Sequence, residues 1–432
     1  MNIFLETYGC QMNVADSELV ASILSRDGLF VVDNIDQADV IIFNTCSVRQ
    51  HAENRVIGRI NQELSRKRQN PKLLIGVIGC MAQRLGKEIS QIIPAVDFVV
   101  GTDQYEFLPE IINKTLETHV FSYKTVSDNS QVYNELHPIH QGKFNAFVTI
   151  MRGCNNFCSY CIVPYTRGRE RSRPVADIIS EITRAGDKGF KDITLLGQNV
   201  NSYRNAEVNF AELLRRVNNI ENISRIRFIT SHPKDLSDEV IEVMAESDKV
   251  CEHLHLALQS GDDDILRRMN RGYTADHFRM IVGKLRKNIP DISITTDVIA
   301  GFPGENQAQF ERTRQIMQEL EFDYAFTYKY SPREGTVAAT FPDQVSETER
   351  LVRLKELIKI QEKITLKKYQ QQIGKIKEIY VENFSRKNKS EVSGKSRDYK
   401  ITVFPGGEEA IGRFIRVRIT DATGWTLRGE SL

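Results

Sequence analysis

The hydrophobic positions of the first hundred residues alternate between short apolar runs and amphipathic stretches. The runs are rich in β-branched residues and occupy Ile3–Cys10, Val40–Cys46 and Leu73–Cys80, which is typical of buried parallel strands. Between them, residues 17–27 carry leucine, valine and isoleucine at helical spacing. This alternation of strand and helix predicts a doubly wound α/β domain over residues 1–117.

A second series of apolar runs follows residue 143 and again alternates with helical patterns such as Ala176–Lys188 and Phe278–Lys287. Six strands are predicted, at Ala146–Met151, Ile193–Gly197, Ile226–Thr230, Leu254–Gln259, Ile292–Ala300 and Ala325–Tyr330. Strands that alternate with helices predict a parallel sheet curled into a partial (β/α)6 barrel, whose chemistry belongs at the carboxyl ends of the strands. The pattern of residues 347–372 predicts a long helix after the last strand, which closes a domain of residues 144–372.

The two remaining segments differ in pattern from these domains. Residues 118–143 are polar with little periodicity and are predicted to form a linker. In residues 373–432, short runs such as Ile376–Val381 and Phe414–Ile419 alternate with turn signals such as Pro405-Gly406-Gly407, which predicts a small all-β barrel.

Charge indicates possible partners only in local segments, because the whole chain has a net charge of +1. The last sixty residues hold 12 Lys and Arg against 8 Asp and Glu, which favours contacts with a phosphate backbone over a merely solvated surface. The candidate contacts are Arg386, Lys387 and Arg416. A second basic feature alternates along one segment at Arg167, Arg169, Arg171 and Arg173. In an extended segment all four would share one face and grip RNA, or else form a solvated edge with Glu170.

Three cysteines carry the strongest chemical signal of the chain. Cys154, Cys158 and Cys161 form a CxxxCxxC array after the first barrel strand, and three thiolates on one loop hold three corners of a [4Fe–4S] cluster. The fourth iron would stay open, and if S-adenosylmethionine binds there, an electron from the cluster can cleave it to a carbon radical. A zinc site is the alternative, but it usually needs a second Cys/His pair, which is absent from the next fifty residues.

A disulfide is a weaker alternative for these cysteines. The chain opens Met1-Asn-Ile-Phe-Leu-Glu, which lacks the pattern of a signal peptide, and no apolar run is long enough to cross a membrane. We therefore expect a cytoplasmic protein without a membrane anchor, in which cysteines serve as ligands more often than as bridges.

Three further cysteines are far apart in sequence but end the same kind of segment. Cys10, Cys46 and Cys80 each follow one of the predicted N-terminal strands. Ligands of doubly wound sheets collect beyond the carboxyl ends of the strands, so these thiols are predicted to converge on a second cluster. The alternative is that each is an ordinary buried cysteine, which we expect for Cys251.

An α/β domain with three cysteines, followed by CxxxCxxC with Tyr160 before its last cysteine, resembles the radical S-adenosylmethionine methylthiotransferase family. The resemblance covers essentially the whole chain, and the C-terminal barrel resembles the RNA-binding TRAM domain. The segment Thr7-Tyr-Gly-Cys10-Gln-Met-Asn13 is similar to the branch that acts on N6-isopentenyladenosine in tRNA. The branches that act on threonylcarbamoyl-adenosine or on a ribosomal protein aspartate carry different residues after this cysteine.

The resemblance implies a monomer with two [4Fe–4S] clusters that uses two S-adenosylmethionine molecules per turnover. Its partners would be a tRNA anticodon stem-loop, a sulfur donor and an electron donor such as flavodoxin or ferredoxin. The radical would take hydrogen from C2 of the isopentenyl-adenine, and the second cluster would supply sulfur for methylation. Both clusters would face a common cavity. A non-catalytic iron–sulfur protein that binds RNA or carries electrons is the remaining alternative.

The resemblance also implies cofactor-binding residues at the strand ends. Tyr160 would lie near the adenine of S-adenosylmethionine, and Gln259 and Asp297 near its ribose. The second strand end, with Gln198 and Asn199, would meet the methionine amino group, and Ser231 at the third strand end is a further cofactor-binding candidate. The alternative for each polar strand end is an ordinary turn.

Overall fold

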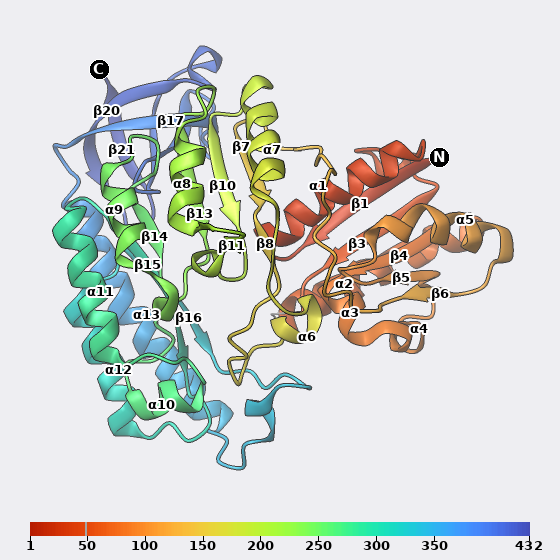
Figure 1. Ribbon diagram of the computed structural model, residues 1–432, viewed down its shortest axis with the longest axis horizontal. Coiled ribbons are helices and arrows are strands. Elements are labelled where there is room, and N and C mark those ends of the chain that lie inside the picture. Colours follow the sequence, from red (N-terminus) through yellow and green to blue (C-terminus); the bar gives the residue numbers. More distant parts are fainter. Residues whose placement is uncertain (48–49) are drawn as a thin grey trace.

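The computed structural model describes residues 1–47 and 50–432 and shows two parallel α/β units and a small barrel (Figure 1). The first unit is a six-stranded sheet of order β2-β1-β3-β4-β5-β6, in which all neighbours are parallel. Its strands are β1 Asn2–Tyr8, β2 Phe30–Val31, β3 Val40–Thr45, β4 Leu74–Gly79, β5 Phe98–Val100 and β6 Ser122–Lys124. Its helices are α1 Gln11–Arg26, α2 Gln50–Gln69, α3 Cys80–Leu85, α4 Ile89–Ile92 and α5 Leu108–Thr118.

Both faces of this sheet are covered by helices, which explains the continuous apolar runs of its central strands. Every residue of β3 and β4 is buried. Successive side chains point to opposite faces, so Val40 and Ile42 join one core cluster while Ile41 and Phe43 join another. The predicted doubly wound domain is confirmed.

The polar segment 118–143 is more ordered than a linker. Its residues Ser122–Lys124 form β6 at the edge of the first sheet. Tyr133 is buried, stacks on Tyr105 with ring centroids 5.8 Å apart, and donates a hydrogen bond to the Thr102 carbonyl at 2.8 Å. A three-residue edge strand and one buried aromatic leave no periodic pattern, so the sequence did not reveal this packing.

The central unit is the predicted partial barrel. Its main strands are β7 Asn145–Thr149, β10 Asp192–Leu196, β13 Arg225–Ile229, β14 His253–His255, β15 Ser293–Ala300 and β16 Tyr324–Lys329. They form two parallel sheets, β13-β10-β7 and β14-β15-β16, which single bridges such as Ser231 to Leu256 connect into one curved wall. Short antiparallel pairs join β8 Met151–Arg152 to β9 Arg171–Ser172, and β11 Arg204–Asn205 to β12 Val208–Asn209.

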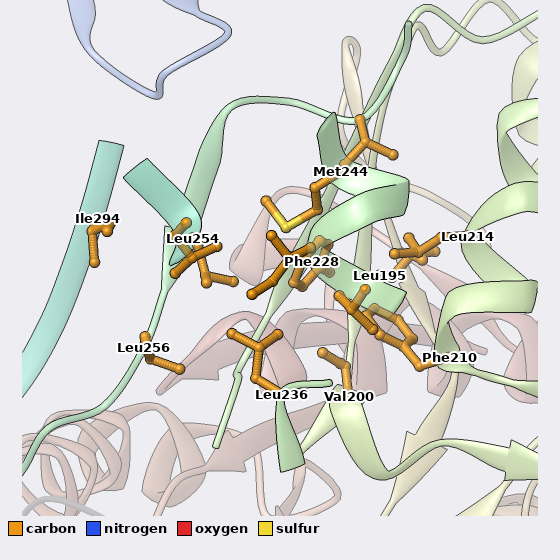
Figure 2. Packing of buried hydrophobic residues seen from close by; sticks show 14 of the residues in the cluster. Leu195, Val200, Phe210, Leu214, Phe228, Leu236, Met244, Leu254, Leu256 and Ile294 are labelled. Atoms are coloured by element: carbon orange, nitrogen blue, oxygen red, sulfur yellow. The ribbon is translucent and has the colours of Figure 1, made fainter. Parts of the chain in front are cut away.

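The largest apolar core lies between this wall and its outer helices. These helices are α7 Val175–Asp187, α8 Phe210–Asn218, α9 Asp238–Glu246, α10 Asp263–Arg268, α11 Ala275–Asn288 and α12 Gln307–Leu320. Figure 2 shows side chains of the strands, among them Leu195 and Phe228, gathered with Leu214 and Met244 of the helices. The outward-facing strand residues therefore hold the wall together, and the carboxyl ends remain for chemistry.

The helix α13 Glu347–Gln370 leads to a closed five-stranded barrel of order β17-β18-β19-β21-β20. Its strands are β17 Ile376–Phe384, β18 Glu391–Ser396, β19 Ile401–Pro405, β20 Phe414–Ala422 and β21 Leu427–Ser431. The predicted helix and small all-β barrel are both confirmed.

Two buried arginines of β13 hold the small barrel against the central one. Arg225 donates to the Lys395 carbonyl at 2.6 Å, and Arg227 donates to the Ser396 carbonyl at 2.9 Å. Arg227 also pairs with the buried Asp192 at 3.0 Å. These contacts involve the amino end of β13, so the small barrel lies opposite the strand ends that carry the chemistry (Figure 1).

Candidate functional site

The first cysteine triad lies on the loop between β8 and the short helix α6 Val163–Arg167. Cys158 is buried, Cys154 and Cys161 are half-buried, and none forms a disulfide. Gly153, with a φ of +77°, allows the tight approach of this loop to the following chain, because a Cβ there would lie 2.0 Å from the Arg169 carbonyl oxygen. The structure therefore holds the three thiols on one compact loop, as their spacing predicts.

Electrostatics favours the neutral thiol at two of these cysteines, Cys154 and Cys161. Burial raises the pKa of Cys154 to about 11, and burial together with the charge of Cys158 raises the pKa of Cys161 to about 12. Arg271 is buried and donates a hydrogen bond to the Cys158 sulfur at 3.4 Å. Thiols of this kind become thiolates when a metal centre supplies positive charge, so the loop fits an iron–sulfur cluster.

The second triad is assembled by the sheet of the first unit. Tyr8, Thr45 and Gly79 are paired across β1, β3 and β4, so Cys46 and Cys80 leave neighbouring strands at the same level. Cys10 follows two residues after the end of β1. Side chains at the ends of adjacent parallel strands lie close together, so the register favours the convergence of the three cysteines, which stays a prediction.

Gly9 and Asn13 shape this second site. Gly9 has a φ of +145°, and a Cβ there would lie 2.7 Å from the Cβ of Cys46. Asn13 accepts a hydrogen bond from the Cys10 thiol at 3.3 Å and donates to the Thr45 carbonyl at 3.2 Å. The glycine and the asparagine of the Thr7–Asn13 segment thus hold Cys10 against the end of β3.

The helix α6 connects the two triads. It begins at Val163, two residues after Cys161, and packs against α3, whose first residue is Cys80 (Figure 1). Its last residue, Arg167, donates to the fully buried Asp16 of α1 at 2.8 Å. A five-residue helix rises by only about 7.5 Å, so the triads belong to one continuous region.

The prediction that four alternating arginines share one face of an extended segment is wrong. Three of the four are buried in ion pairs with carboxylates, in the pairs Arg167–Asp16, Arg171–Asp103 and Arg173–Glu181. Only Arg169 is exposed, with its guanidinium 4.8 Å from the centre of the Phe157 ring. The segment is not extended, because α6, a glycine turn at Gly168 and β9 follow one another, so alternation in sequence does not place the side chains on one face.

Several polar atoms at the carboxyl ends of β10 and β13 are buried without partners in the described part of the chain. These atoms are Gln198 Oε1, Asn199 Oδ1, Ser231 Oγ and His232 Nε2. Burial lowers the pKa of His232 to about 2, so its ring is neutral and able to bind a polar ligand. Buried polar atoms without partners are costly, so this end of the barrel fits a ligand rich in polar groups, such as S-adenosylmethionine.

The other predicted cofactor residues lie on the β14–β15 side of the barrel or beside the triad. Gln259 has a φ of +68°, and its backbone N–H donates a hydrogen bond to the backbone carbonyl of Asp297 at 2.8 Å. The carboxylate of Asp297 lies 3.2 Å from Nε2 of His255. Tyr160 packs edge-on against Phe302, with ring centroids 6.4 Å apart. Their contacts with S-adenosylmethionine remain a prediction.

Two residues near the site escaped the sequence analysis. His255 is found only through its contact with Asp297, and Arg271 only through its contact with Cys158. Each is a lone polar residue without a motif, and only the fold brings it to the site.

The predicted RNA contacts on the C-terminal barrel are accessible. Arg386, Lys387 and Arg416 are all exposed.

In the part of the chain that the structure describes, no helix has the length and apolar character needed to cross a bilayer.

Comparison with known proteins first identifies the class of protein. The chain matches the radical SAM superfamily over residues 148–317, the TRAM domain over 370–432 and the uncharacterized protein family UPF0004 over 2–101. A radical S-adenosylmethionine methyltransferase, TsrM from Kitasatospora setae, aligns with a TM-score of 0.58 at 11% identity over 78% of this chain and 77% of its own. The cobalamin-dependent radical enzyme OxsB aligns with a TM-score of 0.52 over 84% of this chain and 56% of its own. At such low identity these likenesses concern the fold alone.

Full-length relatives narrow the class to a family. A tRNA-2-methylthio-N(6)-dimethylallyladenosine synthase of Thermoanaerobacter sp. (strain X514) is 47% identical over 99% of this chain and 92% of its own. One from Clostridium botulinum (strain Langeland / NCTC 10281 / Type F) is 44% identical over 99% and 96%. The chain belongs to the family of tRNA-2-methylthio-N(6)-dimethylallyladenosine synthases.

Proposed function

We propose that the protein is a tRNA methylthiotransferase that inserts sulfur at C2 of N6-isopentenyladenosine beside the anticodon, giving the 2-methylthio derivative. The observation that carries the proposal is the pair of cysteine triads, one on the barrel loop and one on the first sheet, joined by α6. Cleavage of S-adenosylmethionine needs one triad, so the second suits the supply of sulfur. The relatives named for this reaction, and the TRAM domain, support the substrate.

Each part of the site has a task in this reaction. Cys154, Cys158 and Cys161 would hold one [4Fe–4S] cluster, and Cys10, Cys46 and Cys80 would hold the other. When bound, the clusters and S-adenosylmethionine supply the 5′-deoxyadenosyl radical and the sulfur. The unpartnered polar atoms of Gln198, Asn199 and Ser231 would orient S-adenosylmethionine, with Tyr160, Gln259 and Asp297 around its nucleoside.

The other requirements follow from the chemistry of the reaction. One S-adenosylmethionine would provide the radical and a second the methyl group. An electron donor such as flavodoxin or ferredoxin and a sulfur donor would complete the reaction, and we expect a cytoplasmic monomer. The target base would leave its stack to reach the site, as single-stranded bases can.

The direct test is anaerobic reconstitution followed by incubation with S-adenosylmethionine, a reductant and isopentenylated tRNA. Mass spectrometry of the nucleosides should show a methylthio group on isopentenyladenosine. Cleavage to 5′-deoxyadenosine without this product would move the search to threonylcarbamoyl-adenosine tRNA or to a ribosomal protein. A fully loaded protein that cleaves no S-adenosylmethionine would contradict the radical assignment.

The exposed Arg169 provides a test of the RNA-binding surface. Arg169→Glu should weaken tRNA binding several-fold and lower the slope of log affinity against log salt by about 1, because one phosphate contact is lost. S-adenosylmethionine cleavage without tRNA should stay unchanged. Arg26→Glu makes the same charge reversal at the far end of α1 from Cys10 and serves as the control. Equal weakening by both variants would show a general charge effect.

A further inference from the structure

Arg167 stands between the two cysteine triads and has a part of its side chain unused. It is the last residue of α6, only 4% exposed, and its Nη2 donates to Asp16 Oδ2 at 2.8 Å. Its Nη1 is equally buried but has no partner at normal hydrogen-bond geometry among the described residues. A buried guanidinium N–H without an acceptor is costly, so the position suggests an acceptor that is bound only when the site is filled.

The packing of helices brings this guanidinium to the second triad. Arg167 is the last residue of α6, and α6 packs against α3, whose first residue is Cys80. Both Arg167 and Cys80 are buried. Arg167 therefore belongs to the central unit in sequence but lies beside the cysteine-bearing helix of the first unit.

Asp16 fixes the guanidinium in this place. The carboxylate is fully buried and is shared by Arg167 and Arg152, whose Nη2 lies 2.5 Å from Oδ1. Burial alone would raise the pKa of Asp16, but the two arginines outweigh it and hold that pKa below its usual value. Tyr105 adds a hydrogen bond to the same carboxylate at 3.2 Å, so one side of Arg167 is anchored while Nη1 stays available.

We propose that Arg167 is a positioning residue of the second triad, whose Nη1 donates a hydrogen bond to Cys80 or to a sulfide of the cluster that Cys10, Cys46 and Cys80 hold. The proposal rests on the cluster assignment made above. A hydrogen bond and a nearby positive charge stabilise the more negative, reduced form of a cluster and so raise its reduction potential. Burial rules out the alternative role as an RNA contact, which remains with the neighbouring Arg169.

The test isolates the second cluster in the full-length chain. Cys154, Cys158 and Cys161 are all replaced by alanine, the protein is reconstituted anaerobically, iron is counted, and a redox titration is followed by electron paramagnetic resonance. Arg167→Met in this background should shift the midpoint potential to a more negative value. Arg167→Lys should recover part of the shift, because it keeps the charge. Arg26→Met, exposed at the far end of α1 from Cys10, should leave the potential unchanged.

The other possible outcomes also support or contradict the proposed role of Arg167. A fully loaded Arg167→Met protein with an unchanged potential would overturn the proposal. Loss of the cluster in Arg167→Met but not in Arg167→Lys would support it, because charge at this position would then be needed for assembly. Loss in both variants, with a lowered melting temperature, would leave Arg167 a purely structural partner of Asp16. A shifted potential, together with a parent protein that keeps all its cysteines and yet never forms the methylthio product, would sustain this inference and sink the proposed function.

Discussion

Replacing Cys154, Cys158 and Cys161 by alanine should reduce both the cleavage of S-adenosylmethionine and the formation of methylthio product to background. These three thiols are the ligands that would hold the radical cluster, so the variant loses all of its protein ligands at once. Hydrogen at C2 of an adenine is too inert for acid–base removal, so loss of the radical stops the reaction at its first step. The measurement is 5′-deoxyadenosine by chromatography, together with the iron content, which should fall by half.

The matched control for this change is Cys251→Ala. Cys251 is buried at the amino end of the barrel wall, near Arg227 and Asp192, far from the strand ends that carry the triad. Removing its sulfur should leave iron content and both activities intact. If the triple variant still produced 5′-deoxyadenosine above background, the assignment of the radical site to this loop would be wrong.

The parts of the fold with strong local patterns were predictable. Buried parallel strands need apolar residues at nearly every position, so Val40–Thr45 and Leu74–Gly79 were visible in the sequence as uninterrupted runs. The same rule placed Cys46 and Cys80 at neighbouring strand ends. The spacing of the CxxxCxxC array needed no fold at all, because a short loop is itself enough to bring three thiols together.

The contacts between units could not be predicted from the sequence. Alternating arginines 167–173 have the pattern of an exposed edge, yet Arg167 and Arg171 pair with Asp16 and Asp103 of the first unit, up to 151 residues away. Arg225 and Arg227 also looked like ordinary strand residues, although they hold the C-terminal barrel in place. Buried ion pairs depend on distant partners, and a chain read in order does not show which charge will be covered.

The linker illustrates the same limit at a smaller scale. Residues 118–143 have the polar composition of a loop, but Tyr133 and Leu136 are buried in a core cluster of the first unit. Two isolated buried residues contribute no period, so they are detected only when the surrounding elements are in place.

Replacing Cys10, Cys46 and Cys80 by alanine should separate the two halves of the reaction. The loop of Cys154 lies on a different unit, so reductive cleavage of S-adenosylmethionine should continue at a rate within a few-fold of the parent protein. Methylthio product should fall to background, because the thiols that would hold the sulfur-supplying cluster are gone. The tRNA should keep its unmodified isopentenyladenosine, which mass spectrometry of the nucleosides will show.

The partial variants sharpen this result. Cys80→Ala removes the thiol next to Arg167, and Asn13→Ala removes only the acceptor that holds the Cys10 thiol. If the second triad binds a cluster, Cys80→Ala should lose the product while Asn13→Ala keeps part of it, because a ligand is required and its orienting group only tunes affinity. Sulfur insertion that survives the loss of all three cysteines would show that the sulfur comes from elsewhere, and the first sheet would then be left with a purely structural role.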